Sequence, residues 1–150
     1  MEFQVIDHDS ASYRETVALR DRVLRAPIGL SVTEGDLKGE AAEVHIAGRD
    51  KEGGLVSCAI VRLEESGDPG EAPWIRLRQM AVIGHRRREG IGRALLEFAE
   101  DHARSHLGAT RIYCHVRRRA LPFYEKLGYL PVGEPFEEVG LPHMRMEKEL

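Results

Sequence analysis

A strand that runs through a glycine- and arginine-rich loop into an amphipathic helix constrains this chain more than any other feature. The stretch begins with Met80-Ala81-Val82, and the helix opens at Gly90. The first turn of a helix has N–H groups without partners and about half a positive charge. Gly90 and Gly92 leave the backbone open to a ligand because they have no Cβ atom. The sequence therefore predicts an anion site of the kind that binds phosphate.

Two widespread phosphate loops do not match this stretch. The pattern GxxxxGK[ST] needs a lysine after its glycines, but the residue after Gly92 is an arginine. The dinucleotide pattern GxGxxG needs a third glycine, which is also missing here. Taken alone, Gly90-x-Gly92 is weak evidence for a ligand loop and fits a structural turn better.

The charge of the chain is distributed unevenly, although its net value is only −3. Residues 1–75 carry 8 basic and 15 acidic side chains, whereas residues 76–119 carry 11 arginines and 4 acids. Because the planar fork of arginine matches phosphate and carboxylate groups, the central block favours a small, highly anionic ligand. A solvated basic face is the alternative. Nucleic acid fits less well, since aromatic residues do not interleave with the basic runs and no DNA-reading motif is present.

Length and composition indicate one ordinary domain, 1–150. The chain has 150 residues, of which 42% are hydrophobic and 31% charged. No apolar run approaches the roughly 20 residues of a membrane span, and the first residues lack the pattern of a signal peptide. Cys58 and Cys114 form no CxxC or CxxH pattern, so no metal site is predicted. We expect a reduced cytoplasmic protein that does not bind membranes.

The predicted elements follow a mixed order. Strands are predicted at 3–6, 43–47, 55–63, 74–83, 111–116, 129–132 and 144–149. Helices are predicted after Ser10 or Ser12, from Gly90 to Leu107 and at 119–127, while 26–40 is expected to be a loop. This order predicts an α/β or α+β fold, with one mixed sheet and helices on its faces.

Two motifs in this order resemble the GNAT superfamily of N-acetyltransferases. Arg87-x-x-Gly90-x-Gly92 matches the family signature Q/R-x-x-G-x-G/A, and Met80-Ala81-Val82 lies where the family has its splayed strand. The segment 120–129 is similar to the family pattern A-x-x-F-Y-x-K-x-G-F/Y. The resemblance covers nearly the whole chain. It implies the GNAT fold, with six to seven strands and about four helices, and an acyltransferase that uses acetyl-CoA.

The resemblance also implies where acetyl-CoA binds. The central strand would offer backbone groups to the pantetheine arm, and the loop and helix start would hold the pyrophosphate. The implied cofactor residues are Met80, Ala81, Val82, Arg87, Arg88, Glu89, Gly90, Ile91, Gly92, Arg93, Arg117 and Tyr124. The run 117–119 of three arginines either meets the 3′-phosphate or forms a solvated helix start. Position 117 departs from the family, which often has asparagine there to contact the pantetheine.

Acid and base candidates follow from the chemistry of amide formation. Tyr124 corresponds to the family tyrosine that protonates the departing CoA thiolate, and packing in the core is its alternative role. The attacking amine must lose a proton, which requires a general base. Glu43 and His143 are the main candidates, and His143 lies in a stretch that resembles the GIPHxxM-type ending of some bacterial members. His45, His115 and Glu138 are further candidates.

The acceptor side is predicted from charge. Arg76, Arg78, Gln79 and His45 are the candidate substrate-binding residues. The two arginines suit a carboxylate, and the acidic loop that contains Glu34 suits a cationic amine, so together they favour an amino acid or a similar zwitterion. We expect direct acetyl transfer to a primary amine of a small molecule, in a fold that frequently dimerises. The alternatives are an acyl-CoA sensor without turnover and an enzyme that acetylates a protein amine.

Overall fold

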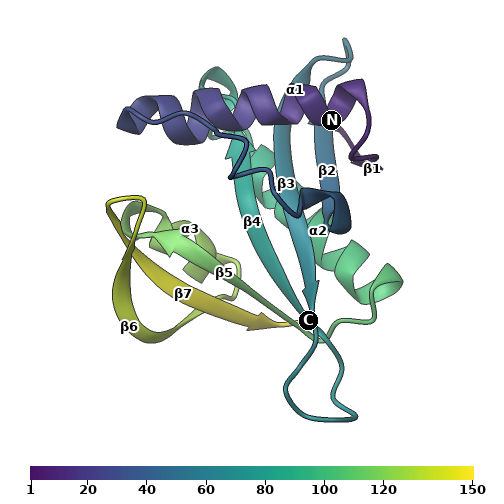
Figure 1. The fold of residues 1–150 in the computed structure, drawn as a ribbon, viewed down its shortest axis with the longest axis vertical. Coiled ribbons are helices and arrows are strands. Elements are labelled where there is room, and N and C mark those ends of the chain that lie inside the picture. Colours follow the sequence, from purple (N-terminus) through teal and green to yellow (C-terminus); the bar gives the residue numbers. More distant parts are fainter.

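A seven-stranded sheet with the order β1-β2-β3-β4-β5-β7-β6 forms the centre of the molecule, as the computed structural model of residues 1–150 shows (Figure 1). Neighbouring strands are antiparallel except β4 and β5, which are parallel. The strands are β1 (Glu2–Ile6), β2 (Val44–Arg49), β3 (Leu55–Glu64), β4 (Trp74–Val82), β5 (Arg111–Arg117), β6 (Leu130–Glu138) and β7 (Leu141–Glu149). The predicted mixed sheet is therefore confirmed.

Helices cover both faces of this sheet. α1 (Ala11–Arg20) lies on one face, while α2 (Ile91–His106) and α3 (Leu121–Lys126) lie on the other (Figure 1). Ser10 caps α1, because its side chain accepts a hydrogen bond from the backbone N–H of Tyr13 at 3.1 Å. The fold has three α-helices against about four expected, since the segment after α1 contains only a π-helical turn and short 3-10 turns. None of the helices combines the length and apolar character that crossing a membrane requires.

The main core lies between the sheet and α2. Leu95, Leu96 and Ala99 of α2 are fully buried against apolar side chains of the central strands, such as Val61 and Leu77. Each fully buried leucine side chain contributes about 1.5–3 kcal/mol to folding. This packing fixes the start of α2 relative to the end of β4, and the sheet therefore positions the loop between them.

β4 and β5 pair along only part of their length. Their ladder runs from Trp74 and Arg111 to Leu77 and Cys114, after which the two strands diverge (Figure 1). Both strands continue beyond this point. Backbone N–H and C=O groups on the facing edges are left without a strand partner and need another one. The divergence thus opens a gap in the sheet with backbone hydrogen-bonding groups along its sides.

A β-bulge in β4 lies beside this gap. Cys58 pairs with Ala81 and Ile60 pairs with Arg78, so that two residues of β4 oppose one residue of β3. Gln79, one of the two, has a φ of 53°, which is unusual for a residue other than glycine. Bulges of this kind change the direction in which a side chain points, and they are common next to active sites.

The last two strands are longer than predicted. The sequence indicated strands at 129–132 and 144–149 with a loop between them, but β6 and β7 extend toward each other and join through Val139-Gly140. Pro131, Pro135 and a bulge hide the strand pattern in β6, which is an exposed edge strand where proline is tolerated. This hairpin brings its turn, with Glu138 and Val139, to the gap between β4 and β5.

Candidate active site

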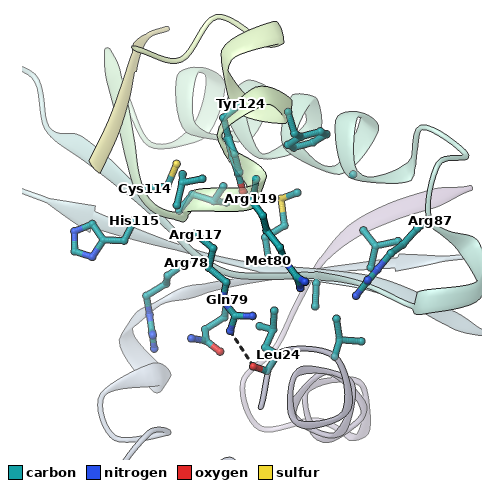
Figure 2. A pocket seen from close by; sticks show the side chains of 18 of the residues that line it. Leu24, Arg78, Gln79, Met80, Arg87, Cys114, His115, Arg117, Arg119 and Tyr124 are labelled. Atoms are coloured by element: carbon teal, nitrogen blue, oxygen red, sulfur yellow. Dashed lines mark hydrogen bonds between the residues drawn. The ribbon is translucent and has the colours of Figure 1, made fainter. Parts of the chain in front are cut away.

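The divergence of β4 and β5 opens into a cleft of about 830 Å³. Its walls come from both strands, from the loop before α2, from the start of α3, from the segment after α1 and from the β6–β7 turn (Figure 2). This volume is in the range of pockets that hold small molecules and cofactors. Nine arginines line the cleft, whereas Glu138 is its single acidic residue.

All of the predicted cofactor residues except Glu89 line this cleft. Glu89 does not, because its carboxylate accepts a hydrogen bond from Arg86 Nε at 2.9 Å. Arg117 lines the cleft but points toward Leu24 in the segment after α1 rather than toward the arginine loop before α2 (Figure 2). The remaining predicted residues form a continuous surface from the bulge of β4 to the first turn of α2.

The arginine loop ends at a helix start that is free to bind an anion. Gly90 has a φ of 79° and caps α2 without a side-chain hydrogen bond, so the first N–H groups of α2 have no side-chain acceptor. Arg87 and Arg88 form no salt bridge, while Arg86 and Arg93 are paired with carboxylates. A Cβ atom at Gly92 would lie 3.4 Å from the Phe123 ring, in van der Waals contact with α3. Free N–H groups and two unpaired guanidinium groups fit a pyrophosphate.

Tyr124 reaches from α3 toward the bulge of β4. Its hydroxyl lies 3.9 Å from Met80 Sδ, a weak acceptor, and has no other partner (Figure 2). Burial raises the pKa of Tyr124 well above its usual value, so the phenol keeps its proton at neutral pH. The side chain is thus a proton donor without a committed acceptor.

The environment of the cleft makes a thiol harder to ionise, as Cys114 shows. It lines the same cleft, and burial raises the pKa of its thiol to about 12. A thiolate formed in the same surroundings is destabilised for the same reason and becomes a stronger base. Protonation of such a thiolate by the Tyr124 phenol is therefore chemically reasonable, even though the pKa of Tyr124 is itself raised.

Glu138 lies at the centre of a polar cluster in the same cleft. Its Oε1 atom is 3.0 Å from His115 Nδ1, and its Oε2 atom is 3.7 Å from His143 Nε2. Arg76 Nη2 is 4.0 Å from the carboxylate and 3.1 Å from His115 Nδ1. Since one ring nitrogen cannot both donate to Glu138 and accept from Arg76, the position of the proton on His115 decides which contact forms.

The tautomer of neutral His143 follows from its other contact. Nδ1 lies 2.9 Å from the carbonyl oxygen of Leu141, which can only accept a hydrogen bond, so Nδ1 carries the proton. Nε2 then presents its lone pair toward Glu138. A proton that Glu138 accepts can therefore pass to His143 Nε2, and this arrangement suits a general base.

The backbone next to Glu138 is strained. Val139 has a φ of 47°, an unfavourable conformation for a β-branched residue, and Gly140 follows with a φ of 74°. Two consecutive positive φ values are typical of the tight turn that joins twisted antiparallel strands. Strain of this kind is retained where surrounding structure or function requires it. Here it holds Glu138 and Val139 in the wall of the cleft.

A buried ion network supports the acceptor side of the cleft. Arg20 and Glu40 form a two-pronged pair, with both N–O distances at 2.8 Å, and are 1% and 0% exposed. Tyr13 donates a hydrogen bond to Glu40 at 2.7 Å, and Arg78 joins Glu40 and Glu43 at 2.8 Å each. Burial opposes ionisation of Glu40, but the hydrogen bonds from Arg20 and Tyr13 outweigh it and lower its pKa. Two cations and two anions make this network neutral.

Several predicted acceptor residues have other surroundings than expected. Arg76, Arg78 and Gln79 line the cleft, but Arg78 is occupied by Glu40 and Glu43. Glu43 lies behind Arg78 and does not line the cleft, so its carboxylate is not placed to act as a base there.

His45 is not in the cleft either. It is buried among Tyr13 and His8, where its Nε2 atom lies 2.7 Å from the carbonyl oxygen of Glu40. Burial lowers its pKa, which keeps the ring neutral. Its position thus argues against the predicted substrate contact. Glu34 and the other acids of its loop are also absent from the cleft lining.

Comparison with known proteins identifies the chain. Residues 32–150 match the family described as "Acetyltransferase (GNAT) domain". The chain belongs to the GNAT acetyltransferase family. An uncharacterized N-acetyltransferase of Bacillus subtilis, YitI, is 30% identical over 149 residues, which is 97% of each chain.

Solved structures share this GNAT fold. The crystal structure of ElaA from Escherichia coli superimposes with a TM-score of 0.79 at 24% identity, over 99% of this chain and 100% of ElaA. A GNAT acetyltransferase from Elizabethkingia anophelis, solved with acetyl-CoA bound, has a TM-score of 0.71 at 13% identity, over 99% and 97% of the two chains. These likenesses confirm the predicted fold, and family membership confirms the predicted acyltransferase class.

Sequence reasoning missed the pair at the centre of the buried network of this GNAT protein. Arg20 lies on the same face of α1 as Tyr13 and Thr16, and all three are buried. The spacing of these positions was a usable signal, because a charged residue in the apolar stripe of a helix requires a buried partner. The partner, Glu40, comes from an irregular segment and carried no such signal.

Proposed function

We propose that this GNAT protein transfers the acetyl group of acetyl-CoA directly to a primary amine of a small molecule. The observation that carries the proposal is the uncommitted hydroxyl of Tyr124 in a cleft that is also lined by Glu138. The cleft therefore combines a proton donor, a proton acceptor and an anion-binding helix start in one continuous space.

Acetyl-CoA fits the arginine-lined half of the cleft. Arg87, Arg88 and the free N–H groups of α2 match the charge of its pyrophosphate, and the unpaired edge of β4 suits the amide groups of its pantetheine arm. The Elizabethkingia anophelis neighbour of the same fold holds acetyl-CoA. When bound, acetyl-CoA supplies a thioester whose carbonyl carbon is open to attack by an amine.

In the proposed mechanism, Glu138 takes the proton of the incoming ammonium group, directly or through a water. The amine nitrogen then forms a bond to the carbonyl carbon, and the carbon–sulfur bond breaks with its electron pair on sulfur. Tyr124 donates its proton to that sulfur, the new amide nitrogen loses its second proton, which returns to the tyrosine oxygen through water, and Glu138 releases its proton to solvent. His115 is a positioning residue, since its Nδ1 atom lies 3.0 Å from the Glu138 carboxylate, and His143 Nε2 can receive a proton that Glu138 has taken.

The reducing conditions of the cytoplasm suit this protein. Both cysteines are free and buried, and burial raises the pKa of each thiol to about 12. Such thiols are poor nucleophiles at neutral pH, because the reactive form is the thiolate. We propose a cytoplasmic location and no covalent acetyl-cysteine stage.

Tyr124→Phe tests the proposal most simply. We expect the variant to bind acetyl-CoA normally while its kcat falls by about 100-fold or more, because phenylalanine cannot donate a proton. The measurement follows thiol release from acetyl-CoA with a panel of small primary amines, and mass spectrometry identifies the acetylated product. Tyr113→Phe is the matched control, since Tyr113 hydrogen-bonds Glu64 and does not line the cleft.

Two results would contradict the proposal. An unchanged kcat in Tyr124→Phe would assign this tyrosine to packing. Normal binding of acetyl-CoA by the wild-type protein without acetylation of any small amine would favour an acyl-CoA sensor or an enzyme that acts on protein amines.

A further inference from the structure

Arg117 reaches across the cleft from β5 to the segment after α1. Its Nη2 atom donates a hydrogen bond to the carbonyl oxygen of Leu24 at 2.9 Å, which joins residues 93 positions apart in the chain. Figure 2 shows the side chain passing the level of β4 and ending near Gln79 and Leu24, on the side of the sheet that carries α1. Tyr124 lies on the other side, with α3. The guanidinium group therefore lies on the acceptor side of the cleft.

The hydrogen bond to Leu24 occupies only one of the N–H groups of Arg117. No other hydrogen bond and no salt bridge involves this side chain, although it is only half-buried and lines the cleft. A guanidinium group has five N–H donors in a rigid fork. The donors that remain are held in place by the contact with Leu24 and are open to a ligand.

Both arginines of the predicted carboxylate site contact other residues of the protein. Arg78 is held by Glu40 and Glu43, each at 2.8 Å. Arg76 shares the cluster of Glu138 and His115. These two residues were predicted to bind the substrate carboxylate. Because both contact other residues of the protein, Arg117 is the better candidate for that role.

The surroundings of Arg117 lack compensating negative charge. Burial and the positive charges of Arg119 and Arg25 lower its pKa, and Glu138 opposes this effect only weakly. An anion bound here would relieve this repulsion. A carboxylate also matches the planar fork of arginine through two parallel hydrogen bonds.

We propose that the acceptor amine carries a carboxylate, and that Arg117 binds this carboxylate while Glu138 receives the amine. This inference rests on the proposed acetyl transfer. It names the substrate class as amino acids or other amino-carboxylic acids, and it makes Arg117 a specificity-determining residue instead of a cofactor contact.

The test compares acceptors that differ only in this charge. Amino acids are assayed beside their carboxamides, which keep the amine but have no carboxylate, with the wild-type protein, Arg117→Gln and Arg118→Gln. Arg118 is the matched control, because it is the next residue, is exposed and does not line the cleft. We expect the wild type and Arg118→Gln to prefer the acid by about 10- to 100-fold in kcat/KM, as charge-assisted hydrogen bonds allow. We expect Arg117→Gln to lose this preference with an unchanged KM for acetyl-CoA.

The outcomes separate this inference from the proposed function. Equal use of acids and carboxamides by the wild type, or a raised KM for acetyl-CoA in Arg117→Gln with the acid preference intact, overturns the inference while acetyl transfer stands. If no amine is acetylated, the proposed function fails. The carboxylate site at Arg117 can still be tested, because calorimetry measures whether amino acids bind to the complex of the protein with CoA. Absence of carboxylate-dependent binding there overturns the inference on its own.

Discussion

Glutamine in place of Glu138 is expected to lower kcat by about 100- to 10,000-fold, because an amide cannot take the proton of the incoming ammonium group. Glutamine keeps the size of the side chain and one acceptor oxygen for His115, which lies 3.0 Å from the carboxylate. The loss therefore reports proton transfer more than altered packing. Steady-state kinetics over a range of pH measures it, and the rise of kcat with pH that a base produces should be absent from the variant.

Glu137→Gln is the matched control for this experiment. Glu137 is the preceding residue of β6, but it is exposed and does not line the cleft. We expect its kinetics to equal those of the wild type. A kcat for Glu138→Gln within threefold of the wild type would contradict the assignment and would transfer the role of base to another group, with His143 as the next to be replaced.

Glu40→Gln is expected to lower the free energy of unfolding by about 3–5 kcal/mol, the usual cost of breaking a buried ion pair on one side. Arg20, which is 1% exposed, would keep its charge but lose the anion that holds it at two points. Urea unfolding followed by circular dichroism measures the change. Tyr13→Phe, which removes only the hydrogen bond at 2.7 Å, should cost about 1 kcal/mol and remains informative if Glu40→Gln does not fold.

An exposed pair provides the comparison for the buried one. Arg93 and Glu97 lie 3.0 Å apart on α2, but their side chains are 68% and 57% exposed. Pairs of this kind contribute at most about 1 kcal/mol, so Glu97→Gln should change stability little. Equal effects of Glu40→Gln and Glu97→Gln would contradict the view that the buried network holds the segment after α1 against β4.

The cofactor half of the site could be predicted from the sequence because its parts are neighbours in the chain. The change from strand period to helix period at Gly90 indicated a helix start, and the glycines and arginines around it indicated an anion. Local physical chemistry decides each of these features. The structure accordingly places Met80, Arg87 and Arg88 in one cleft wall.

The acceptor half depends on distant parts of the chain and could not be predicted in the same way. Arg78 was expected to face a substrate carboxylate, but Glu40 and Glu43 reach it from an irregular segment. Glu138 was one base candidate among several, and only the hairpin of β6 and β7 brings it between His115 and His143. Such contacts arise from packing, and no local pattern records them.

The central claim is that the cleft between β4 and β5 binds the CoA thioester, and thermal unfolding tests it most directly. The protein is heated alone and with acetyl-CoA, CoA, ATP or NAD at equal concentrations. At a ligand concentration about 100 times Kd, binding stabilises the folded state by roughly 2.7 kcal/mol, which a melting curve resolves. We expect a clear rise in Tm with acetyl-CoA and CoA, which is reduced in Arg87→Ala, and little change with ATP or NAD. An equal rise with all four ligands, or none with CoA, would contradict the account.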